Sequence, residues 1–399
     1  MKRLLLITGI LFLFATEILR VYFIMPFPGS QHSNTIGLAY FIDRYRILLR
    51  IVGFLLVVYP LYFYLIKGRT WSKVLLSAVL IFYGVVFYFF NFKFEADKMF
   101  YQPQTVKFAD SATNGVSLDR LVIGIVINNE AKAYPIQVIG YHHQVRDSLG
   151  GAPIMVTYCT VCRTGRVYSP SVNGKNEDFR LVGMDHFNAM FEDATTKSWW
   201  QQATGTSIAG PLKNRQLKEL PSYQSSLREW LLEHPATKIL QPDTIYKKDY
   251  EDLADYDKGT IKGGLERRDS SSWKAKSWVI GVRAGAHAKA YDWNTLVDQR
   301  LIQDTIGSDP VLLSLGADSS SFHVWNRMVQ GKTLDFEQGQ EQGQGQGFMK
   351  DRNTGSVWSV DGKCVSGPLK DEQLQTMQSY QEFWHSWQQF HPQTRRYGI

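Results

Sequence analysis

The chain is poor in cysteine and lacks several of the short motifs that mark common enzymes. Three cysteines in 399 residues are too few for a disulfide scaffold. The sequence contains no Gly-rich phosphate loop, no Gly-x-Ser-x-Gly nucleophile motif and no His-Glu-x-x-His motif. Signatures of a P-loop nucleotidase, an α/β-hydrolase or a zinc protease are therefore absent.

A basic patch on the globular part is also lacking. The chain has 44 Lys and Arg against 37 Asp and Glu, a formal charge of +7. The first hundred residues hold 11 basic and 4 acidic side chains, which leaves 33 of each sign for the remainder. A basic excess beside apolar runs is typical of membrane flanks, so we predict membrane association and no nucleic-acid binding.

Three apolar stretches are present before residue 95, at residues 4–25, 50–66 and 74–92. Each is near the length that crosses about 30 Å of hydrocarbon, and no small-x-small cleavage site follows the first. We therefore predict a transmembrane anchor of three helices over residues 1–95. Glu17 and Arg20 lie three apart near one end of the first stretch, where we expect them to reach the interface.

The basic residues around these stretches give an orientation. Five favour a cytoplasmic N-terminus and second loop, namely Lys2, Arg3, Lys67, Arg69 and Lys73. Three in the first loop argue for the reverse, namely Arg44, Arg46 and Arg50. We favour the first arrangement, which predicts an integral protein of the inner (plasma) membrane with an extracytoplasmic globular part.

The remainder contains an internal repeat. The stretch that begins at Val122 aligns without a gap with the stretch that begins at Val279. The shared positions include these pairs: Gly124 with Gly281, Tyr134 with Tyr291, Asp147 with Asp304, Trp200 with Trp358, and Trp230 with Trp387. Gly124 and Gly281 are predicted to serve a turn or a close backbone approach.

Each copy has short Val-, Ile- and Tyr-rich runs between Gly, Asn and Asp clusters, followed by one amphipathic helix. Ser226 and Glu229 form a capping-box pattern at the helix of the first copy. The fold class is therefore α+β, mainly β, with two tandem copies of one β-rich domain behind the anchor. We place copy one at residues 104–241, a linker at 242–272 and copy two at 273–399.

Copy one alone carries soft ligands. Cys159 and Cys162 align with Gly316 and Ser319, and His142 aligns with Gln299. The cysteine pair lies between two short strand patterns, which predicts a hairpin tip. Two such cysteines can bind one metal or close a disulfide. Cys364 is predicted to be a buried small apolar residue.

A metal at this tip needs further ligands. The tentative set is Cys159, Cys162, His142 and His186, with zinc or copper as the metal. His143 is an alternative ligand, and Asp185 can orient His186. Soft sulfur for copper would come from these residues, each of which also reads as core: Met155, Met184 and Met190.

These motifs resemble the prokaryotic domain-of-unknown-function family 3179. The resemblance is carried by AKAYPIQVIGYHHQVRD, GGAPIMVTYCTVCRTGRVY and FRLVGM…FEDATTKSWW, and it covers residues 120–240 best. It implies site positions at His142, at the two cysteines and at the run with Asp193, Thr196 and Trp200. The family commonly has Pro-Leu between the cysteines, whereas this chain has Thr160-Val161. The resemblance implies an exported or membrane-attached protein and supplies no reaction.

Three functions fit the sequence. The first is a membrane-anchored extracytoplasmic domain that binds a transition metal, or cycles a disulfide, through Cys159 and Cys162. The second is a non-catalytic module that binds a protein partner and in which the cysteines only stabilise a hairpin. The third is an enzyme that uses a cysteine as nucleophile with a histidine base.

Overall fold

The computed structural model describes residues 1–339 and 348–399, which form two compact units. The anchor unit consists of Met1–Tyr101 and Glu177–Gln216, and the main unit consists of Gln102–Asn176 and Leu217–Ile399. The chain therefore enters the main unit, returns to the anchor unit for 40 residues and then completes the main unit.

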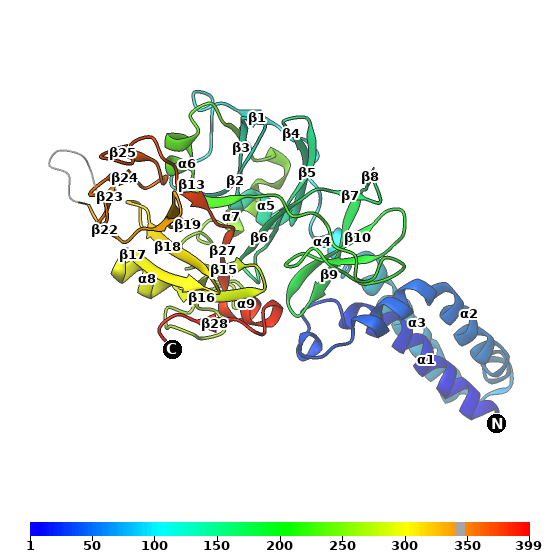
Figure 1. Cartoon of the computed structure of the whole chain (residues 1–399). Coiled ribbons are helices and arrows are strands. Elements are labelled where there is room, and N and C mark those ends of the chain that lie inside the picture. Colours follow the sequence, from blue (N-terminus) through cyan, green and yellow to red (C-terminus); the bar gives the residue numbers. More distant parts are fainter. Residues whose placement is uncertain (340–347) are drawn as a thin grey trace. The chain divides into compact units, whose positions relative to one another are not determined.

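The anchor unit is built on three helices that are long and apolar enough to cross a membrane: α1 (Lys2–Tyr22), α2 (Ile36–Lys67) and α3 (Thr70–Phe92). They lie side by side in Figure 1, and they confirm the three predicted apolar helices. Helix α2 begins 14 residues before the predicted stretch, because its polar first turns pack on protein. Tyr40 in these turns meets the edge of Trp199 at a ring-centroid distance of 5.1 Å. The short helices of this unit are η1 (Ser30–His32) and α4 (Ala96–Met99).

The ionisable residues of α1 do not reach the interface as expected. Glu17 is fully buried and accepts two 2.7 Å hydrogen bonds from Arg50, with a third from Asn91 at 2.8 Å. Arg20 is 3% exposed and pairs with Glu95 at 2.8 Å. The snorkelling prediction was wrong because α2, α3 and the segment after α3 supply partners inside the bundle.

The anchor unit also holds a four-stranded antiparallel sheet, with the order β12-β11-β10-β9. Trp199 and Trp200 on its β11 are buried, and Trp200 donates to Asp193 at 2.9 Å. Its strands are β9 (Phe179–Asp185), β10 (Asn188–Asp193), β11 (Trp199–Gln201) and β12 (Ser207–Ala209).

The first part of the main unit has a five-stranded sheet of order β1-β14-β3-β2-β13 and a three-stranded sheet of order β4-β5-β6. The strands of the larger sheet are β1 (Phe108–Ala109), β2 (Leu121–Ile127), β3 (Glu130–Pro135), β13 (Tyr223–Ser226) and β14 (Lys238–Leu240). The other elements are α5 (Ile136–His142), β4 (Gln144–Leu149), β5 (Ala152–Cys159), β6 (Thr164–Tyr168), β7 (Ser171–Val172), β8 (Lys175–Asn176) and α6 (Leu227–Glu233).

The later part of the main unit has three four-stranded sheets, ordered β27-β15-β16-β28, β17-β18-β19-β26 and β22-β23-β24-β25, and a β20-β21 hairpin. The elements up to β21 are β15 (Trp278–Ala284), β16 (His287–Asp292), α8 (Trp293–Gln299), β17 (Leu301–Ile306), β18 (Asp309–Leu315), β19 (Phe322–Asn326), β20 (Met328–Val329) and β21 (Lys332–Thr333). The rest are β22 (Phe336–Gln338), β23 (Phe348–Asp351), β24 (Val357–Ser359), β25 (Cys364–Ser366), β26 (Gln375–Thr376), β27 (Ser379–Phe383), α9 (Trp384–Phe390) and β28 (Arg395–Arg396).

The predicted class, three apolar helices followed by a β-rich α+β part, is confirmed by these elements. Ser226 caps α6 by accepting from the backbone N–H of Glu229 at 3.2 Å, as the capping pattern predicted. That the β-rich part consists of two copies stays a prediction, as do the proposed domain boundaries.

The segment predicted as a linker, residues 242–272, has structure of its own. It contains η2 (Thr244–Tyr246) and α7 (Lys247–Asp252). Tyr246, Tyr250 and Tyr256 are buried, so this segment contributes packing as well as a connection.

Candidate functional site

Cys159 and Cys162 lie at the turn of a β-hairpin, where the sequence placed them. Cys159 ends β5 and pairs with Thr164 at the start of β6. The turn closes through a 3.3 Å hydrogen bond from the N–H of Arg163 to the carbonyl of Thr160. Arg163 has φ +55°, a left-handed conformation that tight turns require.

This hairpin tip is buried, not presented to solvent. Both cysteines have 0% exposure and both are free thiols. The turn carbonyls accept hydrogen bonds from three later segments: Thr160 O from Tyr256 Oη at 2.9 Å, Val161 O from Lys276 Nζ at 2.7 Å, and Cys162 O from Phe383 N at 3.0 Å. The later part of the main unit therefore covers the turn.

The Cys162 thiol has two hydrogen-bond neighbours, the Cys159 thiol and the Ser386 hydroxyl. Ser386 donates in turn to Glu382 Oε2 at 3.0 Å. The other carboxylate oxygen of Glu382 accepts from Arg166 at 2.5 Å, and both of these charged side chains are 1% exposed. A hydrogen-bonded path therefore leads from the Cys162 sulfur to a buried carboxylate.

The electrostatics favour protonated thiols. Burial raises the pKa of the Cys162 thiol well above its usual value, and the hydrogen bond and the charge of Cys159 raise it further. Ser386 and the Lys276 ammonium act in the opposite direction. Burial also lowers the pKa of Lys276. A thiol in this state is a poor nucleophile because the thiolate is the reactive form.

The two adjacent histidines are buried separately from solvent. His142 lies among Tyr141, Tyr246 and Tyr250, and its Nε2 contacts Tyr250 Oη at 2.6 Å. His143 has φ +61°, and burial lowers its pKa to about 4. His143 is therefore neutral at pH 7.

The third candidate histidine, His186, belongs to the anchor unit, whereas the cysteines and His142 belong to the main unit. Its Nδ1 contacts Asp185 Oδ1 at 2.7 Å. This hydrogen bond raises the pKa of His186. Asp185 thus orients His186, as the sequence suggested for a carboxylate–histidine pair.

Among the described residues, no group of three or more His, Cys, Asp or Glu side chains is arranged to hold a metal ion. A closed tetrahedral zinc site needs four ligands, and the hairpin offers the two sulfurs. The residues present therefore do not fit zinc or copper as a resident group. Met155, Met184 and Met190 are buried core residues.

Sequence reasoning missed the groups that cover the cysteines, namely Tyr256, Lys276, Glu382 and Ser386. They lie between 94 and 224 residues after Cys162, outside the motif. No local signal connects a hairpin with side chains so distant in sequence. The alignment of the two halves was informative here, because Ser386 and Glu382 lie in a stretch that it had assigned to the second half.

The family model described as "Protein of unknown function (DUF3179)" matches residues 101–394. This range includes the hairpin, its covering residues and both halves of the β-rich part. No curated protein and no solved structure matches the chain significantly.

Proposed function

Because this chain belongs to the DUF3179 family, whose description names no reaction, we propose a function from its own geometry: Cys159 and Cys162 form a protected thiol–disulfide couple in a membrane-anchored protein. One observation carries the proposal. The two thiols are hydrogen-bonded to each other inside the protein. A disulfide needs only two sulfurs in contact, whereas a metal site or a nucleophilic site needs more.

The competing functions have less support at this turn. A resident metal lacks a third ligand among the described residues. A cysteine nucleophile needs a lowered pKa and a base, but the pKa of Cys162 is raised and the His142 Nε2 contacts Tyr250. The disulfide couple requires neither additional ligands nor a pre-formed thiolate.

The chemistry is thiol–disulfide exchange with an external small disulfide as the oxidant. One cysteine loses its proton, attacks the external disulfide and forms a mixed disulfide, which releases one thiol. The second cysteine loses its proton and attacks the mixed disulfide, which releases a second thiol and forms the Cys159–Cys162 bond. The path through Ser386 gives the Cys162 proton an acceptor in Glu382.

Burial sets the rate of this couple. Because both sulfurs have 0% exposure, an oxidant reaches them only when the covering contacts open. The pair therefore responds slowly to the redox state of its surroundings and does not turn over as a rapid oxidoreductase. Closing the disulfide would lock the hairpin turn under Tyr256 and Lys276.

Equivalent contacts in the two halves support a duplicated scaffold. Tyr134 and Tyr291 each donate to an Asp, at 2.7 and 2.9 Å. Trp230 and Trp387 each donate to a Thr seven residues later, at 3.0 and 2.8 Å. Gln224 donates to its own equivalent Gln381 at 2.9 Å, as expected on a pseudo-two-fold axis. In this proposal copy two has lost its own cysteines and shields those of copy one.

An extracytoplasmic location for the β-rich part suits this couple. Three membrane crossings place the N-terminus and the β-rich part on opposite sides, and the basic residues favour a cytoplasmic N-terminus. Disulfides form and persist outside the cytoplasm, where oxidants are present. We propose the inner (plasma) membrane, with the hairpin on its outer side.

The test uses the full chain purified in a mild detergent. After incubation with oxidised dithiothreitol, native protein is denatured, alkylated and analysed by mass spectrometry. We expect slow formation of one Cys159–Cys162 disulfide, a loss of two alkylatable thiols, and faster formation when low denaturant opens the fold. Ser386→Ala is expected to slow the reaction severalfold, because it interrupts the path to Glu382.

Cys364→Ser is the matched control, since Cys364 is also a buried free cysteine. This variant should still lose two thiols, whereas Cys159→Ser should lose none. Two thiols that stay reduced even in the opened protein would reduce the pair to a structural role. Stoichiometric zinc or copper that Cys159→Ser removes would favour the metal function instead.

A further inference from the structure

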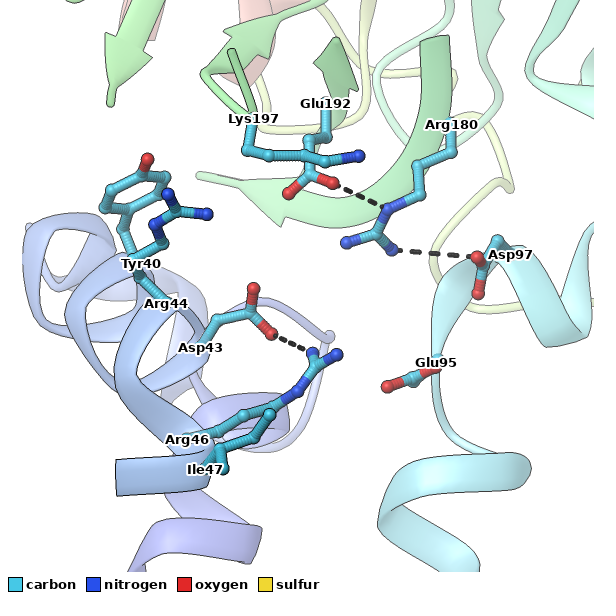
Figure 2. Close-up of a pocket in the computed structure, with 10 residues that line it drawn as sticks. All are labelled: Tyr40, Asp43, Arg44, Arg46, Ile47, Glu95, Asp97, Arg180, Glu192 and Lys197. Carbon is cyan, nitrogen blue, oxygen red and sulfur yellow. Dashed lines mark hydrogen bonds and ion pairs between the residues drawn. The ribbon is translucent and has the colours of Figure 1, made fainter. Parts of the chain in front are cut away.

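A second site lies in the anchor unit, in a pocket of about 400 Å³ that charged side chains line. Figure 2 shows these side chains around an open space, with contributions from α2, from the segment at α4 and from the sheet. Its lining includes four acidic residues, Asp43, Glu95, Asp97 and Glu192.

The acidic residues of the pocket are already paired. Asp43 contacts Arg46 at 3.0 Å, and Glu192 contacts Arg180 at 2.9 Å. The same Arg180 reaches Asp97 at 3.6 Å. Glu95 is paired with the buried Arg20 at 2.8 Å, beneath the pocket. The pocket therefore has no acid left to attract a cation.

Two cations remain. In the part of the chain that the structure describes, no ion pair or side-chain hydrogen bond joins Arg44 or Lys197 to another residue. Arg44 lies beside Tyr40 on α2, and Lys197 is on the turn before β11 (Figure 2). The unpaired charge of the pocket is thus positive, which suits an anionic group.

The position of the pocket along the helices indicates where that anion comes from. From Ile47 to Ile66, α2 is apolar over 20 residues, a rise of about 30 Å, which matches the hydrocarbon thickness. Ile47 lines the pocket and is 66% exposed. Helix α3 ends at Phe92, shortly before Glu95 and Asp97. The pocket therefore lies where both helices leave the hydrocarbon, at the level of lipid headgroups.

We propose that this pocket binds the phosphate of a membrane phospholipid, with Arg44 and Lys197 as its ligands. Arg offers a planar pair of N–H donors to phosphate oxygens, and Lys adds a point charge. The acyl chains would leave past Ile47 along the exposed apolar face of α2, which includes Leu48, Ile51 and Leu55. A free phosphate would use the same cations but gain nothing from this face.

The test is native mass spectrometry of the full chain in a maltoside detergent, titrated with phosphatidylglycerol. Wild-type protein should bind one lipid at low concentration. The double variant Arg44→Gln/Lys197→Gln should lower its affinity at least tenfold, and Lys197→Gln alone at least threefold. Arg44→Lys/Lys197→Arg keeps both charges and should retain most of the binding.

The matched control is Lys213→Gln/Arg215→Gln, which removes the same two charges from exposed positions of the same unit outside the pocket. Its affinity should equal that of the wild type. Equal affinity in the pocket variant and the control would overturn the proposal. Millimolar inorganic phosphate that displaces the lipid completely would also overturn it, because the ligand would then be phosphate alone.

Discussion

At the residue scale, several histidines of the main unit are held neutral by burial. The pKa of His143 is lowered to about 4, and that of His385 to about 3, with loss of hydration as the largest cause in both. Burial lowers the pKa of His391 to about 4 as well. Each of these rings favours the folded state only while it is uncharged.

The buried histidines predict a loss of stability in acid. The unfolded chain binds a proton at His143 near pH 6.5, whereas the folded chain binds it only near pH 4. The contribution is therefore fully present above pH 6.5 and is lost as the pH falls to about 4. His143→Asn, which tolerates the left-handed backbone, should reduce the drop in unfolding free energy between pH 7 and 5 by about 1–2 kcal/mol. Denaturant unfolding at both pH values measures this difference, and an unchanged drop would contradict it.

The cysteines could be located from sequence, but their environment could not. Strand patterns on both sides of Cys159 and Cys162 placed them at a hairpin turn, which the strands have. Exposure of that turn depends on residues more than 90 positions away, such as Tyr256 and Lys276. Local pattern carries no information on what covers a turn, and so the expectation of a presented pair of sulfurs was wrong.

At the scale of elements, helix α6 packs on strand β2 through a glycine. A Cβ placed on Gly124 would collide with the Trp230 ring, and one on Gly281 would collide with Trp387 of α9. Both tryptophans are at most 1% exposed, so neither ring has room to move. The sequence predicted a close approach at these two glycines, and the reason is the ring of the following helix.

Gly124→Ala should therefore destabilise the protein by overpacking. We expect a loss of about 1–3 kcal/mol in unfolding free energy, measured by denaturant unfolding with Trp fluorescence. Gly281→Ala should have an effect of the same size, because it meets the same contact. Gly151→Ala is not a suitable control because Gly151 has φ +78°, whereas Gly37→Ala meets no atom within 4 Å and should be nearly neutral. A Gly124→Ala protein as stable as Gly37→Ala would show that the helix can shift away.

The helices of the anchor unit show what periodicity misses. Hydropathy located all three apolar segments, because spanning length is a property of composition. It missed the first 14 residues of α2, whose polar face packs against protein and not lipid. It also misplaced Glu17, because the partners Arg50 and Asn91 come from two other helices.

At the scale of the whole molecule, the fold class followed from the sequence while the division into units did not. Apolar runs and strand patterns predicted helices followed by a β-rich part, as the structure has. Residues 177–216 belong to the same compact unit as the apolar helices. Contacts such as Tyr40 with Trp199 create that association, and they join residues 159 positions apart. Sequence alignment of the two halves contains no such information.

The orientation of the molecule in the membrane gives a last prediction. The N-terminus and the loop at Gly68 carry five basic residues, and a cytoplasmic position for them leaves residues beyond Phe92 outside. The native cysteines are all buried, so a single introduced cysteine can report accessibility with little background. Asp119 has an 81% exposed side chain in the main unit, and Trp71 is 85% exposed near the Gly68 loop.

In intact cells, a membrane-impermeant maleimide should therefore label Asp119→Cys and leave Trp71→Cys unlabelled. Permeabilised cells should label both, which controls for reactivity. The reverse pattern would place the β-rich part in the cytoplasm, where reducing conditions keep thiols reduced. In that case the Cys159–Cys162 couple would face no standing oxidant, and the proposed disulfide would lose its physiological basis even if it forms in vitro.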